Sequence, residues 1–176
     1  CTWLGAPGVR QACADAPNHS YLYGWGYPGE VAGGTLVVGA VSEAINATGV
    51  NSPLTVVSGT QADHAAIGAG AAYVFPRSGP TWSQQAYLKA SNTDVFDEFG
   101  FSIAVSGDTV VVGTFREDSN ATGVNAPVTG GSGTQADNSA SGAGAASVFP
   151  RRGPAWGPQA YLQASTTNTV HHVGTS

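Results

Sequence analysis

The chain repeats itself with a period of 74 residues. When residues 31–91 are laid on residues 105–165, 40 of the 61 positions are identical and no gap is needed. Trp82 then falls on Trp156, and the segment "GTQAD" recurs in the same phase. Self-similarity at a fixed period is typical of repeat architectures, in which each copy forms one structural unit. Both copies are therefore expected to take the same fold.

The same phase extends beyond the well-matched region. Upstream it aligns Trp25-Gly26 with Phe99-Gly100, and downstream it places Val173-Gly174 at the same two positions. The predicted organisation of the 176 residues is an N-terminal segment (1–24), a first repeat (25–98), a second repeat (99–172) and the start of a third repeat (173–176).

Each repeat predicts four β-strands. In the second copy they are expected at 101–106, 109–115, 144–150 and 156–164. The first of them alternates apolar and polar residues, whereas the second is apolar at three successive positions, as in a strand covered on both faces. Turn residues separate them, with Ser-Gly-Asp at 106–108 and "RRGP" at 151–154. The predicted fold class is all-β, with two four-stranded antiparallel blades of the propeller type in tandem.

Composition narrows the classes of partner. Only 10% of the residues are charged, the net charge is −5, and the chain has six Lys and Arg in all. A nucleic-acid partner is not expected, because phosphate neutralisation needs clustered cations. No apolar run approaches the roughly 18 residues of a transmembrane helix.

The second repeat resembles a known family. The segments "EFGFSIAVSGDTVVVGT", "SGAGAASVF" and "WGPQAYLQAS" are similar to the FG-GAP repeat of integrin-alpha-type β-propellers, in its bacterial extracellular branch. The resemblance covers residues 25–174 and implies blades that commonly close in sevens, in secreted or surface proteins that serve in adhesion and binding without chemistry of their own. One departure is Pro28-Gly29, which stands where the second copy has Ser102-Ile103 and is expected to break or displace that outer strand.

Two blades cannot close a ring, so we expect neighbouring subunits to complete the propeller. Apolar blade faces and unpaired strand edges favour self-assembly into a fibre or a multi-subunit propeller. Residues 1–24 are a possible donor strand, with Trp3 and Trp25 as interface residues. Two alternatives stay open: a lectin-like module that binds carbohydrate or another ligand between blades, and a non-catalytic part of a larger secreted protein.

A long polar insert separates the second and third strands of each repeat. In the second copy, residues 116–141 offer Glu117, Asp118, Asn120 and Asp137, and the resemblance implies that such a region can hold calcium. Calcium takes six to eight oxygen ligands, and the alternating Asp pattern of a dedicated calcium loop is absent here. The alternative is a solvated loop held by Asx-type turns.

Modification sites and cysteines are the remaining candidates. Asn18, Asn46 and Asn120 each begin an N-glycosylation sequon. Cys1 and Cys13 predict a disulfide if the chain is secreted; two unpaired thiols or a lipid-modified Cys1 are the alternatives.

No catalytic constellation can be nominated, so enzymatic activity is not expected. The carboxylates are expected in flexible inserts rather than around a pocket. The adjacent His171 and His172 resemble a metal-binding pair, but neighbouring residues on a strand point to opposite faces. They also fall in a linker that is expected to be solvated.

Overall fold

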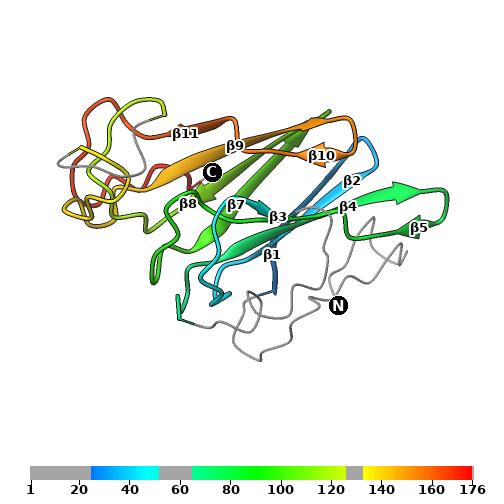
Figure 1. Cartoon of the computed structure of the whole chain (residues 1–176), viewed down its shortest axis with the longest axis horizontal. Helices are drawn as coiled ribbons and strands as arrows, with labels where there is room; N and C mark the ends of the chain where they lie inside the picture. Colours follow the sequence, from blue (N-terminus) through cyan, green and yellow to red (C-terminus); the bar gives the residue numbers. More distant parts are fainter. Residues whose placement is uncertain (1–24, 52–64, 126–132, 176) are drawn as a thin grey trace.

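The structure is a computed structural model that describes residues 25–51, 65–125 and 133–175. The regular elements of these residues are all β-strands (Figure 1). Among them there is no helix long and apolar enough to cross a membrane. The predictions for Cys1, Trp3, Cys13, Asn18 and the donor segment 1–24 lie outside the described residues.

The first repeat forms one antiparallel sheet, named blade 1 here. Its main strands are β1 (Trp25–Ala32), β2 (Thr35–Ala40), β4 (Ala71–Ser78) and β6 (Ala86–Leu88), in the order β1-β2-β4-β6. Two short strands, β3 (Val50–Asn51) and β5 (Thr81–Trp82), pair with β6 and β4 respectively.

The second repeat forms an equivalent sheet, blade 2. Its strands are β7 (Phe99–Ser106), β8 (Thr109–Thr114), β9 (Ala145–Arg152) and β11 (Ala160–Leu162), with the short β10 (Ala155–Trp156) paired to β9. β9 pairs with β8 on one side and with β11 on the other. The predicted all-β class with two four-stranded antiparallel units is confirmed.

The fourth strand of each blade is shorter than predicted. The stretch 156–164 was expected to be continuous, but the structure divides it into β10 and β11. Trp156 pairs with Arg151, and Ala160 pairs with Val148. Four steps along this strand therefore oppose three steps along β9, which is a bulge. Pro158 lies in the bulge, where a residue without an N–H group costs no ladder bond.

The outer strand of blade 1 is not broken at Pro28. The expectation of a break there is wrong, because β1 runs continuously from Trp25 to Ala32. The register shifts only between Trp25 and Tyr27. β1 is the last strand in its sheet, and an edge strand tolerates a residue that cannot donate to a neighbour.

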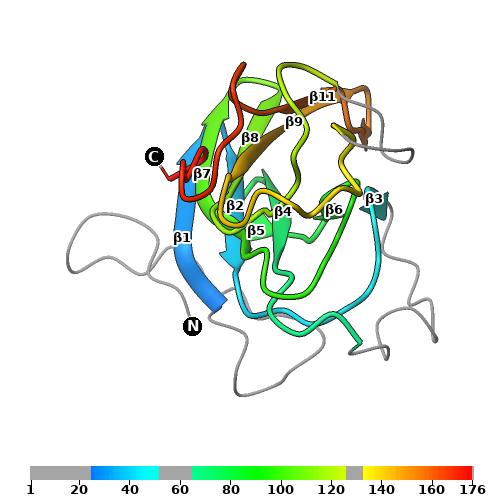
Figure 2. The same cartoon turned by 90° about the vertical axis from the view of Figure 1, so that its left-hand side faces the viewer.

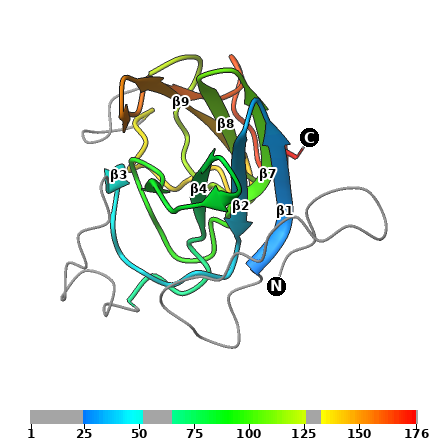
Figure 3. The same ribbon diagram turned by 90° about the vertical axis from the view of Figure 1, so that its right-hand side faces the viewer.

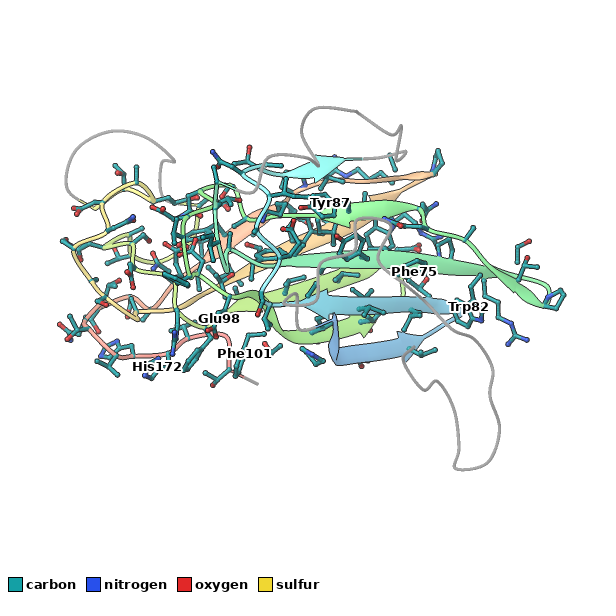
Figure 4. All side chains as sticks on the ribbon, turned by 90° about the horizontal axis from the view of Figure 1, so that it is seen from below. Phe75, Trp82, Tyr87, Glu98, Phe101 and His172 are labelled. Atoms are coloured by element: carbon teal, nitrogen blue, oxygen red, sulfur yellow. The ribbon has the colours of Figure 1, made fainter. Side chains whose placement is uncertain are left out.

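The main core lies between the two blades. It contains Val37, Val74 and Leu88 from blade 1 and Val110, Val112, Phe149 and Trp156 from blade 2. Figures 2 and 3 show β1 and β2 beside β7, where the two sheets approach each other. Trp156 is buried, and its Nε1 donates across the interface to Gln85 Oε1 at 2.8 Å. Trp82, the equivalent residue of blade 1, is only half-buried and lies toward the hairpin end of the molecule (Figure 4).

The start of each repeat docks on the preceding blade through backbone atoms. Gly70 forms a parallel bridge with Phe99, and Gly144 forms the equivalent bridge with Val173. The N–H groups of Phe99 and Val173 donate to the carbonyl of the residue before each glycine, at 2.9 and 3.1 Å. Val173 therefore contacts blade 2 in the way that Phe99 contacts blade 1.

The docking leaves no room for a side chain on the receiving strands. A Cβ atom on Gly70 would lie 2.1 Å from the carbonyl oxygen of Phe99, and one on Gly39 would lie 2.3 Å from that of Gly100. Gly70 also has a φ of +80°, in the left-handed region that glycine favours. The glycines of the repeat thus set how closely one unit approaches the next.

Comparing Gly70→Ala with Gly33→Ala should separate the cost of the backbone clash from the cost of the left-handed backbone conformation. Gly33 has a φ of +56°, but no atom lies within 4 Å of the position that a Cβ would take. Gly33→Ala should therefore lose only the unfolding free energy that a left-handed alanine costs, about 1–2 kcal/mol. Gly70→Ala adds a backbone clash and should lose about 2–5 kcal/mol of unfolding free energy. Urea denaturation followed by circular dichroism measures both. Equal losses would show that the close approach does not hold the blades together.

Candidate functional site at the blade junction

The linker between the blades holds the insert of blade 2. Asn92 Nδ2 donates to Glu117 Oε1 and to the Gln135 carbonyl, both at 2.9 Å. Ser91 Oγ donates to Gln135 Oε1 at 2.5 Å. Side chains that directly follow blade 1 therefore fix the start and a later turn of the second insert.

Each insert places one glutamate inside the protein. Glu43 and Glu117 occupy equivalent positions and are 0% and 1% exposed. Each accepts the backbone N–H of the residue two positions later, Ile45 at 2.8 Å and Ser119 at 2.9 Å. The expectation that the insert carboxylates lie in a solvated, flexible loop is wrong for these two, because the backbone turns around them and supplies donors.

The two glutamates differ in their counter-charge. In blade 1, Lys89 Nζ lies 2.9 Å from Glu43 Oε2 and donates to the Gly70 carbonyl at 2.7 Å. The equivalent of Lys89 in blade 2 is the uncharged Gln163. Among the described residues, Glu117 Oε2 is buried and has no hydrogen-bond partner. Blade 2 thus buries a carboxyl group without the cation that balances its counterpart.

Gln163 takes part in a neutral network instead. Its Nε2 donates to the Ser119 carbonyl at 3.0 Å, and its Oε1 accepts from Ser119 Oγ at 2.9 Å. Ser119 Oγ is also 2.9 Å from the Tyr161 hydroxyl. Burial, with a smaller contribution from the nearby Glu117, raises the pKa of Tyr161, so this phenol stays protonated.

A second carboxyl group is buried beside Glu117. Asp97 is 3% exposed and accepts the backbone N–H of Asp94 at 2.8 Å. Burial raises the pKa of Asp97 to about 7, and the hydrogen bond from Asp94 opposes the shift. Burial, together with the neighbouring Asp97 charge, raises the pKa of Glu117 to about 8. The junction therefore contains two carboxyl groups that exchange protons near neutral pH.

The four residues predicted to bind calcium take part in hydrogen bonds with the insert and its flanking residues, Asn120 through its backbone and Glu117 also with Asn92 of the linker. Asp118 Oδ1 accepts the Gly142 N–H at 2.7 Å, and Asp137 Oδ2 accepts the Gly133 N–H at 3.1 Å. The Asn120 N–H donates to the Asp137 carbonyl at 2.6 Å, and Glu117 is buried as described above. In residues 25–51, 65–125 and 133–175, no three acidic, His or Cys side chains form a group that could hold a metal ion. Calcium at this insert stays a prediction.

The sequons and the histidine pair lie in different surroundings. Asn46 is exposed, whereas Asn120 is half-buried. His171 is exposed, as expected of a solvated linker, but His172 is half-buried and stacks on Phe115 with ring centroids 4.5 Å apart. Phe101 also stacks on Phe115, with ring centroids 4.7 Å apart, and Figure 4 shows it near His172. Glycosylation of the two described sequons stays a prediction.

Fold and junction together define a β-propeller-like repeat module, with two blade-like units in the described part of the chain. Residues 82–127 match the family model described as FG-GAP repeat, so the chain carries the repeat that its sequence resembles. The match runs from the end of blade 1 through the junction and the first two strands of blade 2 into its insert. No curated protein and no solved structure matches the chain. FG-GAP repeats are generally non-catalytic and typically occur in extracellular proteins.

Sequence reasoning did not find the residues that organise this site. Lys89, Asn92, Asp97 and Gln163 lie in regions that looked like an ordinary strand or linker. The one available signal was the difference between the two copies, in which a lysine of the first becomes a glutamine of the second. When one copy of a close repeat has a charged residue and the other does not, the surroundings of that position are expected to differ between the copies.

Stability is expected to fall as pH rises through the neutral range. Unfolded Asp and Glu have pKa values of about 3.9 and 4.3, so between pH 4 and pH 8 the folded chain holds protons that the unfolded chain has lost. The contribution of Asp97 and Glu117 is therefore complete below about pH 4 and is lost as pH rises through 7 to 8. The melting temperature followed by circular dichroism should rise from pH 8 to pH 5. Glu117→Gln should flatten this profile, because it removes one of the two groups that titrate.

Substituting the side chains that face Glu43 and Glu117 should change how stability depends on pH, because one glutamate loses a cation and the other gains one. Lys89→Gln leaves Glu43 buried without a cation and should cost about 3–5 kcal/mol at pH 8. Gln163→Lys supplies a partner for Glu117 Oε2, so it should stabilise the protein at pH 8 relative to pH 5. Denaturant titrations at both pH values measure these effects. An unchanged pH profile in Gln163→Lys would mean that Glu117 is not the group that titrates.

Proposed function

We propose that the protein is an extracellular, non-catalytic structural or adhesive module that assembles with copies of itself by stacking one blade on another. The FG-GAP repeat and the two-blade fold support the statement that the protein is a propeller-like repeat module. A comparison of the two blades supports the proposed assembly by blade stacking.

The outer face of blade 2 carries the observation on which the proposal depends. This face consists of Val111, Ala146, Val148, Ala160 and Leu162. Their equivalents in blade 1 are Val37, Ala72, Val74, Ala86 and Leu88, which are all 0% exposed and pack against blade 2. The five residues of the outer face remain apolar but are only partly buried. Blade 2 thus presents the same surface that blade 1 uses to bind another blade.

One strand edge of each blade is already paired within the chain, whereas β1 and β7 are the last strands at the opposite edges. β6 is covered by β3 from its own insert, and Val124 forms a bridge with Leu162 at the corresponding edge of blade 2. An edge that is already paired is a poor template for another chain. Stacking of apolar faces is therefore the mechanism that we favour.

The two faces of the molecule also indicate how copies would be arranged in the assembly. On the other face of blade 1, Leu36, Val38 and Tyr73 are buried. A head-to-tail fibre would need that face to open, whereas two copies can join their outer faces about a two-fold axis without rearrangement. A two-fold pair is the arrangement that the proposal expects first.

Size-exclusion chromatography with light scattering tests the proposal. The wild-type protein should have a mass of at least two chains, falling toward 17.7 kDa on dilution. Val148→Arg should be monomeric, because it places a charge in the centre of the outer face. Val95→Arg is the matched control, since Val95 is 44% exposed and lies in the linker away from that face. A wild-type monomer at every concentration would contradict the proposal.

A further inference from the structure

A cavity of about 300 Å³ lies between the blades, beside the Tyr161 ring. Its walls include Lys89 and Ser91 from the end of blade 1, Gln135 from the second insert, and Ser147, Phe149 and Tyr161 from blade 2. Ser147, Phe149 and Tyr161 are 6%, 1% and 5% exposed, so this side of the cavity belongs to the interior. Asn125, Pro158 and Gln159 also line it and are exposed, so the cavity opens to solvent on their side. Its volume is at the lower end of the about 300–1,000 Å³ of small-molecule sites.

The repeat shows what is missing from this cavity. In blade 1, Tyr73 and Tyr87 are cross-strand partners whose rings meet edge to face, with centroids 5.0 Å apart and an interplanar angle of 65°. The equivalent pair in blade 2 is Ser147 and Tyr161, in the same register. One aromatic ring has thus been replaced by a hydroxymethyl group, and Tyr161 lines a cavity where Tyr87 contacts a ring.

The walls carry no free charge. The only ionisable groups among the lining residues are Tyr161, whose raised pKa keeps it neutral, and Lys89. The Lys89 ammonium is bound to Glu43 and to the Gly70 carbonyl. What remains is two aromatic rings with amide and hydroxyl groups around them. Such a lining suits an uncharged ligand with an apolar body and a polar tip.

We propose that this cavity binds a small, uncharged aromatic molecule of the phenol class, whose ring takes the place that the Tyr73 ring occupies in blade 1. The ring would meet Tyr161 edge to face, as Tyr73 meets Tyr87, and would cover Phe149. The phenol hydroxyl would reach the amide and hydroxyl groups at the cavity mouth.

The probe is 4-methylphenol, which is the tyrosine side chain as a free molecule. Titration calorimetry should show saturable binding of one molecule per chain. The non-aromatic 4-methylcyclohexanol, which has a similar size and the same polar group, should bind at least several-fold more weakly, because it cannot make the edge-to-face contact. Equal affinities would overturn the assignment to an aromatic ligand.

Substitution at the missing ring tests the location. Ser147→Tyr should fill the cavity, abolish binding of 4-methylphenol and raise the melting temperature. Ser165→Tyr adds the same side chain at an exposed position and should leave binding unchanged. Retained binding in a folded Ser147→Tyr variant would overturn the proposal.

A measurement on the wild-type protein keeps the proposal testable if Ser147→Tyr does not fold. Nuclear Overhauser contacts should connect the methyl group of 4-methylphenol with the ring protons of Tyr161 and Phe149. Contacts to other aromatic residues, or no saturable binding, would overturn it. The cavity lies between the blades of one chain, and Ala160 is the one outer-face residue among those that line it. Repeating the titration on the Val148→Arg variant therefore separates ligand binding from assembly.

Discussion

The backbone contact between successive repeats is the constraint on which the rest of the structure depends. Phe99 enters the space above Gly70, and Val173 enters the space above Gly144, in each case with a carbonyl where a Cβ would have to be. This approach fixes the position of each new blade relative to the last. The apolar faces can then meet, and the linker side chains can reach the following insert. A chain without glycine at these positions could form the strands but not this stack.

Once the blades are stacked, differences between the repeats acquire chemical meaning. A close repeat would be expected to give two identical environments, yet Lys89 becomes Gln163 and Tyr73 becomes Ser147. The first change leaves Glu117 as a buried carboxyl with a raised pKa, because desolvation is no longer balanced by a cation. The second removes a ring and leaves space beside Tyr161. Both changes lie on the side of blade 2 that faces blade 1, whereas its outer face keeps the apolar residues of the first copy.

The sequence predicted the strands well and the inserts poorly. Strand positions follow from short apolar runs between turn residues, and these local signals sufficed for β7, β8 and β9. The bulge before β11 and the continuity of β1 through Pro28 depend on pairing with a neighbour, which local pattern does not contain. The insert looked solvated because it is rich in Gly, Ser and Thr. Glu43 and Glu117 are nevertheless buried, since burial of a polar side chain depends on donors supplied from elsewhere in the fold.

By itself, the sequence determined that the chain consists of equivalent β-units in tandem, because a period of 74 residues and the turn residues within it are properties of the linear order. It also determined the family resemblance. Only the tertiary structure decided which faces of those units are covered, which carboxyl groups lose their water, and that a cavity lies where the ring is absent. These properties arise between residues far apart in the chain, such as Lys89 with Glu43 and Ser147 with Tyr161. Their energies depend on distance and burial, and neither quantity exists before the chain has folded.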